Sequence, residues 1–189
     1  MKKMPTLFKR IFKNNKIVKV SAEVTEGCEW VLNGEGIATE KLDGACCAII
    51  DGEFYKRFDY KPGRKLPDGA IPCQEKADEI TGHFPHWVKV KSDNPADKWY
   101  LEAYYNATYE ADGTYEAVGK HFNGNPYQRT YDEIHRHGEI ILFDVPRDYE
   151  GIKKYLKEHY IEGIVFHRNN GEMCKIKRTD FGYEWVKLN

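Results

Sequence analysis

The sequence predicts an α+β fold that is built mainly of antiparallel β-sheet and flanked by a few helices. Two observations predict it. Short strand-like runs separated by turn residues outnumber helical patterns, and only one segment has clear helical spacing of apolar residues. The 189 residues are 41% hydrophobic and contain no internal repeat and no Gly/Ser linker, so we expect a single domain over residues 1–189.

Two β-hairpins are indicated by turn residues between strand-like runs. Ala45–Ile50 is apolar, Asp51-Gly52 is a hairpin dipeptide, and Glu53–Phe58 follows it directly. Further along the chain, the runs Gly163–His167 and Met173–Lys177 flank the turn sequence Asn169-Asn170-Gly171. Each pair of runs is expected to form two adjacent antiparallel strands.

Three more runs have the composition of strands. Lys98–Tyr105 and Gly113–Val118 alternate aromatic and polar residues, and Glu139–Val145 is apolar and β-branched. We therefore expect a strand over each of these three ranges.

Helical signals are confined to two segments. Asp148–His159 has apolar residues at helical spacing, and Asp148 itself is a suitable N-cap. The expected helix over Tyr131–His137 would have only two turns. The periodic residues of the longer helix are Tyr149, Ile152, Tyr155 and Leu156.

The charges are balanced over the whole chain but not along it. The 29 basic and 30 acidic residues give a net charge of −1, which argues against a protein that coats nucleic acid or membranes through its net field. Residues 1–22 form a basic segment that can hold a polyanion or simply face water. Its basic residues are Lys2, Lys3, Lys9, Arg10, Lys13, Lys16 and Lys19.

The first residues contain no apolar run of the length that a signal peptide or membrane span needs. We therefore expect a cytoplasmic protein without a membrane partner, and no obligate protein partner is evident.

The five cysteines show no CxxC pair and no regular spacing, so a disulfide framework is not expected. Zinc could recruit the histidine pair His83 and His86, or the pair His135 and His137. Neither pair has the helical i,i+4 spacing or a neighbouring cysteine couple, so surface or loop histidines are the favoured interpretation.

The candidate chemistry begins at Glu40-Lys41-Leu42-Asp43-Gly44, directly before the strand Ala45–Ile50. A lysine at a strand entrance is held on rigid scaffold, and a glycine three residues later lets a phosphate or another backbone approach closely. The same short motif also occurs in ordinary surface turns, so it needs support from elsewhere in the chain.

That support comes from Glu162-Gly163-Ile164-Val165-Phe166 and Lys175-Ile176-Lys177. In this order, the three elements resemble motifs I, IV and V of the covalent nucleotidyltransferases, the superfamily of ATP-dependent ligases and messenger-RNA capping enzymes. The run 140–145 resembles the aromatic motif of RNA ligases. The stretch from Thr114 to Tyr127 resembles the small vertebrate-type RNA ligases most closely. The resemblance extends from Thr39 to Lys177 and implies the nucleotidyltransferase fold.

The resemblance implies a three-step reaction. Lys41 attacks the α-phosphate of ATP, AMP passes from the lysine to an RNA 5′-phosphate, and an RNA 3′-hydroxyl then displaces AMP. The implied partners are therefore ATP and RNA ends, and the implied metal is Mg²⁺, with Mn²⁺ as a substitute.

It also implies a role for particular residues. Lys41, Lys175 and Lys177 are the catalytic candidates, and Glu162 is the metal candidate. Glu116 is expected to contact the ribose, although Glu102 is a rival for that role. The other nucleotide-binding candidates are Glu40, Asp43, Arg57 and Phe143.

General chemistry agrees with these roles. A lysine nucleophile must be neutral, whereas its ordinary pKa of about 10.4 keeps it protonated at pH 7, so neighbouring cations and burial have to lower that pKa. Lys175 and Lys177 alternate on one strand and point to the same face, where both can contact one phosphate. Phe143 has two open interpretations, because an aromatic residue in an apolar run can belong to the core or stack on a base.

Two alternative functions stay open. One is a GTP-using capping-type enzyme, although the twelve residues after Lys177 are too few for the OB-fold domain of such enzymes. The other is a non-catalytic module that binds RNA ends or nucleotides. For an RNA ligase, we expect the basic segment and the loop 121–127 to contact RNA, and charge reversal of Lys9, Arg10 and Lys13 to weaken RNA binding while sparing lysyl-AMP formation.

Overall fold

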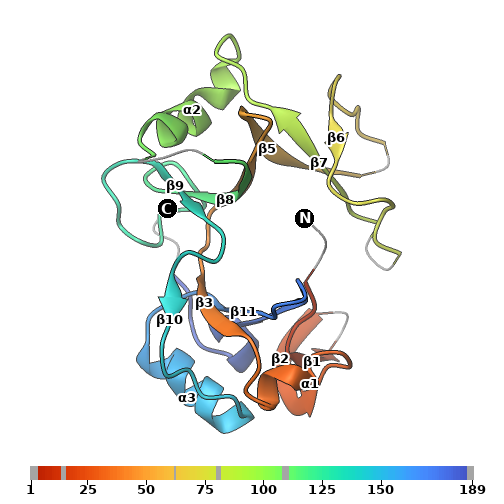
Figure 1. Cartoon of the computed structure of the whole chain (residues 1–189), viewed down its shortest axis with the longest axis vertical. Coiled ribbons are helices and arrows are strands. Elements are labelled where there is room, and N and C mark those ends of the chain that lie inside the picture. The colour runs from red at the N-terminus through yellow and green to blue at the C-terminus, as the bar shows by residue number, and fades with distance from the viewer. Residues whose placement is uncertain (1–3, 14–15, 62, 80–81, 108–110, 187–189) are drawn as a thin grey trace. The chain divides into compact units, whose positions relative to one another are not determined.

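The computed structural model describes residues 4–13, 16–61, 63–79, 82–107 and 111–186. Lys2 and Lys3 of the basic segment lie outside the described residues, as does the side chain of Lys16. The chain forms two compact units, which we call the central unit (residues 43–137) and the outer-segment unit (residues 4–42 and 138–186) (Figure 1). The expected organisation as one domain stays a prediction.

The central unit contains a six-stranded sheet in which every pairing is antiparallel. The strand order is β6-β7-β5-β4-β8-β9. Asp51 and Gly52 both have positive φ, at 51° and 73°, so the expected hairpin turn is confirmed. The strands are β4 (Ala45–Ile50), β5 (Glu53–Tyr60), β6 (Ile71–Pro72), β7 (Phe84–Lys89), β8 (Gly113–Val118) and β9 (Glu133–Arg136).

The strand expected over residues 98–105 is wrong, because Lys98–Tyr105 is helix α2. A short 3-10 helix, η1 (Pro95–Asp97), leads into it, and the Asn94 side chain accepts a hydrogen bond from the Ala96 N–H at 3.2 Å. Tyr100, Ala103 and Tyr104 pack on the core with the spacing of one helix face. That spacing and the Asn-Pro start signal favour a helix over alternation.

The helix expected over residues 131–137 is also wrong, because Glu133–Arg136 forms strand β9. This edge strand pairs with β8, where Glu116 lies opposite His135 and Ala117 lies opposite Ile134. Ile134 is buried in the core, so sheet pairing overrides a weak local preference for helix.

The outer-segment unit contains a four-stranded antiparallel sheet in the order β10-β3-β11-β12 and a separate two-stranded sheet formed by β1 and β2. The predicted strands 163–167 and 173–177 are confirmed as β11 and β12. The strands are β1 (Phe8–Lys13), β2 (Lys16–Val24), β3 (Ile37–Lys41), β10 (Ile141–Leu142), β11 (Gly163–His167) and β12 (Met173–Lys177).

Helix α3 (Tyr149–Glu158) confirms the predicted helix of this unit, and Asp148 caps it by accepting a hydrogen bond from the Gly151 N–H at 2.9 Å. In contrast, the strand expected over residues 139–145 is reduced to the two residues of β10. Asp144 has a φ of 57° just after it, which turns the chain out of the sheet. The remaining helices are α1 (Glu29–Leu32) and the 3-10 helix η2 (Arg178–Phe181).

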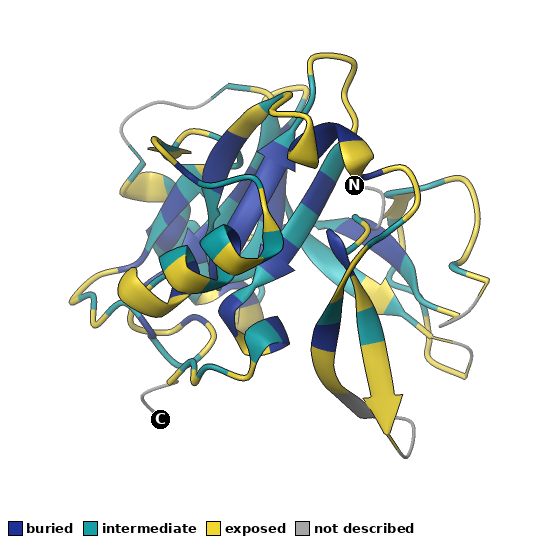
Figure 2. Ribbon diagram, turned by 90° about the horizontal axis from the view of Figure 1, so that it is seen from below, coloured by how far each residue is buried: buried dark blue, intermediate teal, exposed yellow. Residues whose placement is uncertain are grey.

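Each unit has its own hydrophobic core. Figure 2 shows buried residues along the strands and exposed residues along the outward side of the helices and in loops. In the outer-segment unit, Ile152 and Leu156 of α3 are fully buried against Ile164 and Phe166 of β11. The predicted α+β class with mainly antiparallel sheet is therefore confirmed. None of the helices in the described ranges is long and apolar enough to span a membrane.

Candidate active site

Three strands of the outer-segment unit bring the lysine candidates together. Strand β11 lies between β3, which ends at Lys41, and β12, which ends at Lys177. In the register of this sheet, Gly163 is paired with Lys41 on one side and with Lys177 on the other. The residue before it, Glu162, therefore enters the sheet between the two lysines.

The Glu162 carboxylate joins the two lysines. Its Oε2 accepts a hydrogen bond from Lys41 Nζ and its Oε1 accepts one from Lys177 Nζ, each at 2.5 Å. Only 3% of the Glu162 side chain is exposed, whereas the two lysines retain partial access to solvent. A carboxylate that is this well buried would be costly without both ion pairs.

Gly163 allows the close packing that places these side chains. A Cβ atom at this position would lie 2.3 Å from the backbone oxygen of Ile176 and 3.0 Å from the Cα of Lys177. Only glycine therefore lets β11 and β12 approach to this distance.

Lys175 is a third cation of the cluster. Burial lowers the pKa of Lys175 from 10.5 to about 8, and the positive charges of Lys41, Lys177 and Arg10 lower it further. The backbone at Lys175 is fixed on both sides, because its N–H donates to the Pro5 oxygen at 3.0 Å and its oxygen accepts from the N–H of Leu7 at 2.7 Å.

Arg10 is a site residue that the sequence did not single out. Its guanidinium lies 3.5 Å from Oδ1 of Asp180, a buried carboxylate whose Oδ2 accepts a hydrogen bond from the Lys177 N–H at 2.9 Å. The sequence placed Arg10 in a basic segment, and no local pattern distinguished it from its neighbours. Its proximity to Lys175 results from the packing of the N-terminal strands.

Phe143 and Glu40 lie in the same unit. Phe143 is 77% exposed just after β10, so the interpretation as a core residue is wrong and the ring is available to a ligand. Glu40 lies on β3 next to Lys41, and its charge contributes to a raised pKa of Tyr155, after the larger effect of burial.

The central unit holds the residues that follow Lys41. The Gly44 N–H donates to Glu116 Oε1 at 3.0 Å, and the Asp43 N–H donates to the Tyr127 hydroxyl at 2.7 Å. The Asn123 side chain donates to the Asp43 carboxylate. Two side chains of the loop expected to contact RNA are thus used to hold the backbone and side chain of Asp43.

Gly44 accommodates a backbone. A Cβ atom there would lie 2.1 Å from the oxygen of Ala117, so the glycine permits the approach of β8. This is one of the two reasons for a glycine that the sequence raised; the other was the approach of a phosphate.

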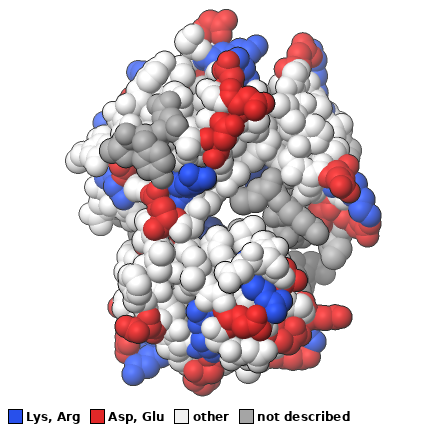
Figure 3. Space-filling model, in the orientation of Figure 1, with Lys and Arg blue, Asp and Glu red and all other residues white. Residues whose placement is uncertain are grey.

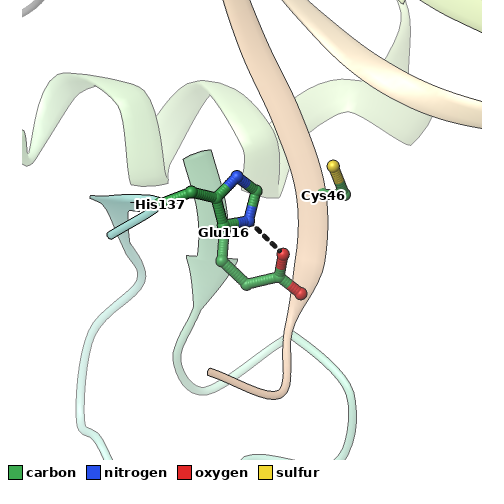
Figure 4. A group of neighbouring side chains, drawn as sticks. All are labelled: Cys46, Glu116 and His137. Carbon is green, nitrogen blue, oxygen red and sulfur yellow. Dashed lines mark hydrogen bonds and ion pairs between the residues drawn. The ribbon is translucent and has the colours of Figure 1, made fainter. Parts of the chain in front are cut away.

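The two rival acids have different surroundings. Glu116 bonds to Gly44 of the lysine motif and accepts from His137 Nε2 at 3.0 Å (Figure 4). Glu102 lies on α2, where its carboxylate is grouped with His121 and Asp132. The contact with the motif glycine favours Glu116 as the acid that belongs with Lys41.

Arg57 lies on β5 and forms an ion pair with Asp59 at 2.9 Å. Its charge also reaches Cys46, where it opposes a larger effect of burial. Burial and the negative charge of Glu116 together raise the pKa of the Cys46 thiol to about 12. Arg57 and Glu116 therefore act electrostatically on the same part of the central unit.

The residues present suit magnesium at Glu162. Magnesium prefers hard oxygen ligands and usually binds through one or two carboxylates together with waters and substrate phosphates. Glu162 supplies such a carboxylate, surrounded by the cations that phosphates require. On the face drawn in Figure 3, acidic and basic side chains are interspersed, in agreement with the net charge of −1.

All five cysteines are free thiols, so the expected absence of a disulfide framework is confirmed. Cys28 and Cys174 are both fully buried in the core of the outer-segment unit.

Comparison with known proteins identifies relatives of this chain. A family model described as RNA ligase 1 matches residues 106–189. RNA ligase 1 of Pongo abelii is 23% identical over 222 residues, covering 79% of this chain and 68% of the relative. The rat protein of the same name, from Rattus norvegicus, is 24% identical over 225 residues with the same coverage. RNA ligase 1 of Danio rerio is 24% identical over 220 residues, covering 78% of this chain and 68% of the relative.

These matches confirm the resemblance that the motifs indicated: the chain belongs with an RNA ligase family. Within that class, its relatives are the vertebrate proteins named RNA ligase 1. The region matched by the family model includes Glu116, Phe143, Glu162, Lys175 and Lys177, whereas Lys41 precedes it.

Proposed function

We propose that the protein is an ATP-dependent RNA ligase with the nucleotidyltransferase fold. It attaches AMP to Lys41, transfers AMP to an RNA 5′-phosphate and seals that end to a 3′-hydroxyl. The observation that carries the proposal is the group of three lysines around the buried Glu162 carboxylate. The relationship to proteins named RNA ligase 1 supports it independently.

In the first step, Lys41 acts as the nucleophile. Its ammonium must first lose a proton, to Glu162 or to water, because only the free amine has a lone pair to attack phosphorus. A bond then forms between Nζ and the α-phosphorus of ATP, and the bond from that phosphorus to the bridging oxygen breaks. Pyrophosphate leaves with the electron pair of the broken bond, and lysyl-AMP remains.

Lys175 and Lys177 bind the phosphates in this proposal. They alternate on β12, so both side chains project from one face of the strand. Cations placed where negative charge develops stabilise the transition state, and they do so most strongly in a partly buried site. Magnesium held by Glu162 would add further positive charge at the phosphates, and manganese would serve as its substitute.

Phe143 and Glu116 would select the nucleoside. The exposed ring of Phe143 offers a stacking surface for adenine. Glu116 would accept hydrogen bonds from the ribose hydroxyls, and Glu40, Asp43 and Arg57 would line the nucleotide site. Use of ATP over GTP rests on the resemblance to RNA ligases.

The remaining two steps transfer AMP. An oxygen of the RNA 5′-phosphate attacks the phosphorus of lysyl-AMP, the N–P bond breaks, and Lys41 recovers its amine. The RNA 3′-hydroxyl then attacks the activated 5′-phosphate, loses its proton to solvent and releases AMP.

The exposed basic residues of the N-terminal hairpin are the best candidates for RNA contact. Lys13 and Lys19 are exposed, whereas Lys9 pairs with Glu23 and Arg10 with Asp180. Charge reversal of Lys13 and Lys19 should weaken RNA binding and flatten its salt dependence while lysyl-AMP formation continues. Arg10 is omitted from this test because its charge acts on Lys175. Equal loss of RNA binding and lysyl-AMP would contradict a role limited to RNA.

Covalent labelling tests the function. The protein is incubated with Mg²⁺ and α-labelled ATP or GTP, beside Lys41→Ala and the control Lys154→Ala, whose side chain is 73% exposed on α3. We expect acid-labile label from ATP in the wild type and the control but not in Lys41→Ala, followed by sealing of 5′-phosphorylated RNA. Label from GTP would instead indicate a capping-type enzyme, and nucleotide binding without label would indicate a binding module.

A further inference from the structure

A second cluster of chemically active side chains lies wholly within the central unit. Cys46 on β4 and Glu116 on β8 are directly opposite each other in the register of the sheet. His137 follows β9, and its N–H donates to the Thr114 oxygen at 3.0 Å, so its backbone is tied to β8. Figure 4 shows the three side chains converging from these separate segments.

We propose that Cys46, Glu116 and His137 form a binding site for a divalent transition metal ion, with zinc as the best match. A thiol sulfur, a carboxylate oxygen and an imidazole nitrogen from these residues all lie within 4.8 Å of one another. Zinc bonds of about 2.0–2.3 Å in tetrahedral geometry place two ligand atoms roughly 3.3–3.8 Å apart. Small side-chain rotations therefore suffice to close the cluster around one ion.

The types of ligand define the class of metal. Thiolate and imidazole suit zinc, copper and other borderline or soft ions, whereas magnesium and calcium prefer oxygen alone. One thiolate and one carboxylate together carry two negative charges, which a divalent ion neutralises. Three protein ligands leave a fourth position of a tetrahedron for water.

Neighbouring groups already orient two of the three ligands. Glu116 Oε1 accepts the Gly44 N–H at 3.0 Å, which directs Oε2 toward His137. Such outer contacts fix the orientation of metal ligands in known sites. Nδ1 of His137 is buried and has no hydrogen-bond partner within the described ranges, so the ring has bonding capacity beyond its contact with Glu116.

The sequence favoured surface histidines at this position for a specific reason. His137 was paired with its neighbour His135, and no cysteine couple lay nearby along the chain. Pairing of β4 with β8 and of β8 with β9 brings Cys46 and Glu116 to the second of those histidines only. His135 instead lies 3.0 Å from Glu133.

The site does not depend on the proposed ligase activity, although the two share Glu116. A metal bound by Glu116 would compete with a ribose for its carboxylate. The metal should therefore be measured without nucleotide, so that failure of either proposal can be recognised separately.

The test is titration of the full-length, metal-stripped protein with Co²⁺ and Zn²⁺. We expect one equivalent to bind, with thiolate-to-cobalt charge-transfer absorption in the Co²⁺ form and displacement by Zn²⁺ but not by Mg²⁺. Cys46→Ser should abolish the charge-transfer band. His137→Asn should weaken metal affinity by at least about the 10–100-fold that is typical for loss of an outer contact.

Matched controls are Cys73→Ser and His135→Asn, which remove the same residue types at other positions of the central unit. Both should bind Co²⁺ as the wild type does, and Lys41→Ala should also do so while losing lysyl-AMP. Circular dichroism without metal verifies that each variant is folded. Absence of a thiolate band in the wild type, or equal loss of affinity in the controls, would overturn the proposal.

Discussion

The Nζ atom of Lys41 lies 2.5 Å from Oε2 of Glu162, and the other oxygen of the same carboxylate lies 2.5 Å from Nζ of Lys177. One buried acid therefore holds both the proposed nucleophile and a proposed phosphate ligand. This arrangement makes Glu162 important for stability as well as for chemistry, and the two effects can be measured separately.

Replacement of Glu162 by glutamine should impair both properties. The change leaves Lys41 and Lys177 close together without a negative charge between them, which should lower the free energy of unfolding by about 2 kcal/mol. Formation of lysyl-AMP should fall by roughly 100-fold or more, as is typical when one charge-stabilising group is removed. Denaturant unfolding and labelling with ATP measure the two effects. The control Glu158→Gln, with its side chain 57% exposed on α3, should change neither.

Lys175 should lower stability at neutral pH while it supports activity. Because the pKa of Lys175 is about 8 in the folded protein and 10.5 in its ordinary state, burial of the charged form is unfavourable below pH 8. Lys175→Met should therefore raise the free energy of unfolding at pH 7 by on the order of 1–3 kcal/mol, while it reduces lysyl-AMP formation.

The pH dependence of this effect has a defined sign. Between about pH 8 and 10.5, the unfolded chain still binds the Lys175 proton and the folded chain does not, so the stability of the wild type rises with pH relative to Lys175→Met. The difference between the two proteins should shrink over that window in thermal unfolding experiments. A constant difference from pH 7 to 10 would contradict the lowered pKa.

Phe143→Ala should separate binding from folding. The ring is 77% exposed, so its loss should change stability by less than about 0.5 kcal/mol. If it stacks on adenine, nucleotide affinity should fall by about 1–3 kcal/mol, the range measured for aromatic–base stacking. Binding of ATP to a Lys41→Ala background isolates affinity from chemistry. Ile141→Ala, 47% exposed on β10, is the matched control and should bind ATP normally.

Gly163→Ala should distort the strand pair that carries the cluster. The added methyl group would meet the Ile176 oxygen at 2.3 Å, a backbone atom that can move only if β12 moves. We expect a loss of roughly 2–3 kcal/mol of stability, in the range of overpacked cores, together with loss of lysyl-AMP. A variant with wild-type melting temperature and activity would show that the two strands can separate without consequence.

Much of the fold was predictable because it depends on local signals. The Asp51-Gly52 turn, the Asp148 cap and the turn before β12 are decided by residues that are neighbours in sequence, and all three were identified. The two wrong assignments, at α2 and β9, occur where local patterns are ambiguous. In both places, packing on the central core decides between helix and strand.

The site divides in the same way. The sequence by itself determined the motif residues Lys41, Glu162, Lys175 and Lys177 and the relationship to RNA ligases, because order and spacing are properties of the chain. Only the tertiary structure decided that Glu162 bridges two lysines, and that Arg10 acts on Lys175. It also decided that Phe143 is exposed and that Cys46, Glu116 and His137 meet. These relationships depend on pairing between distant strands, for which a single sequence carries no local signal.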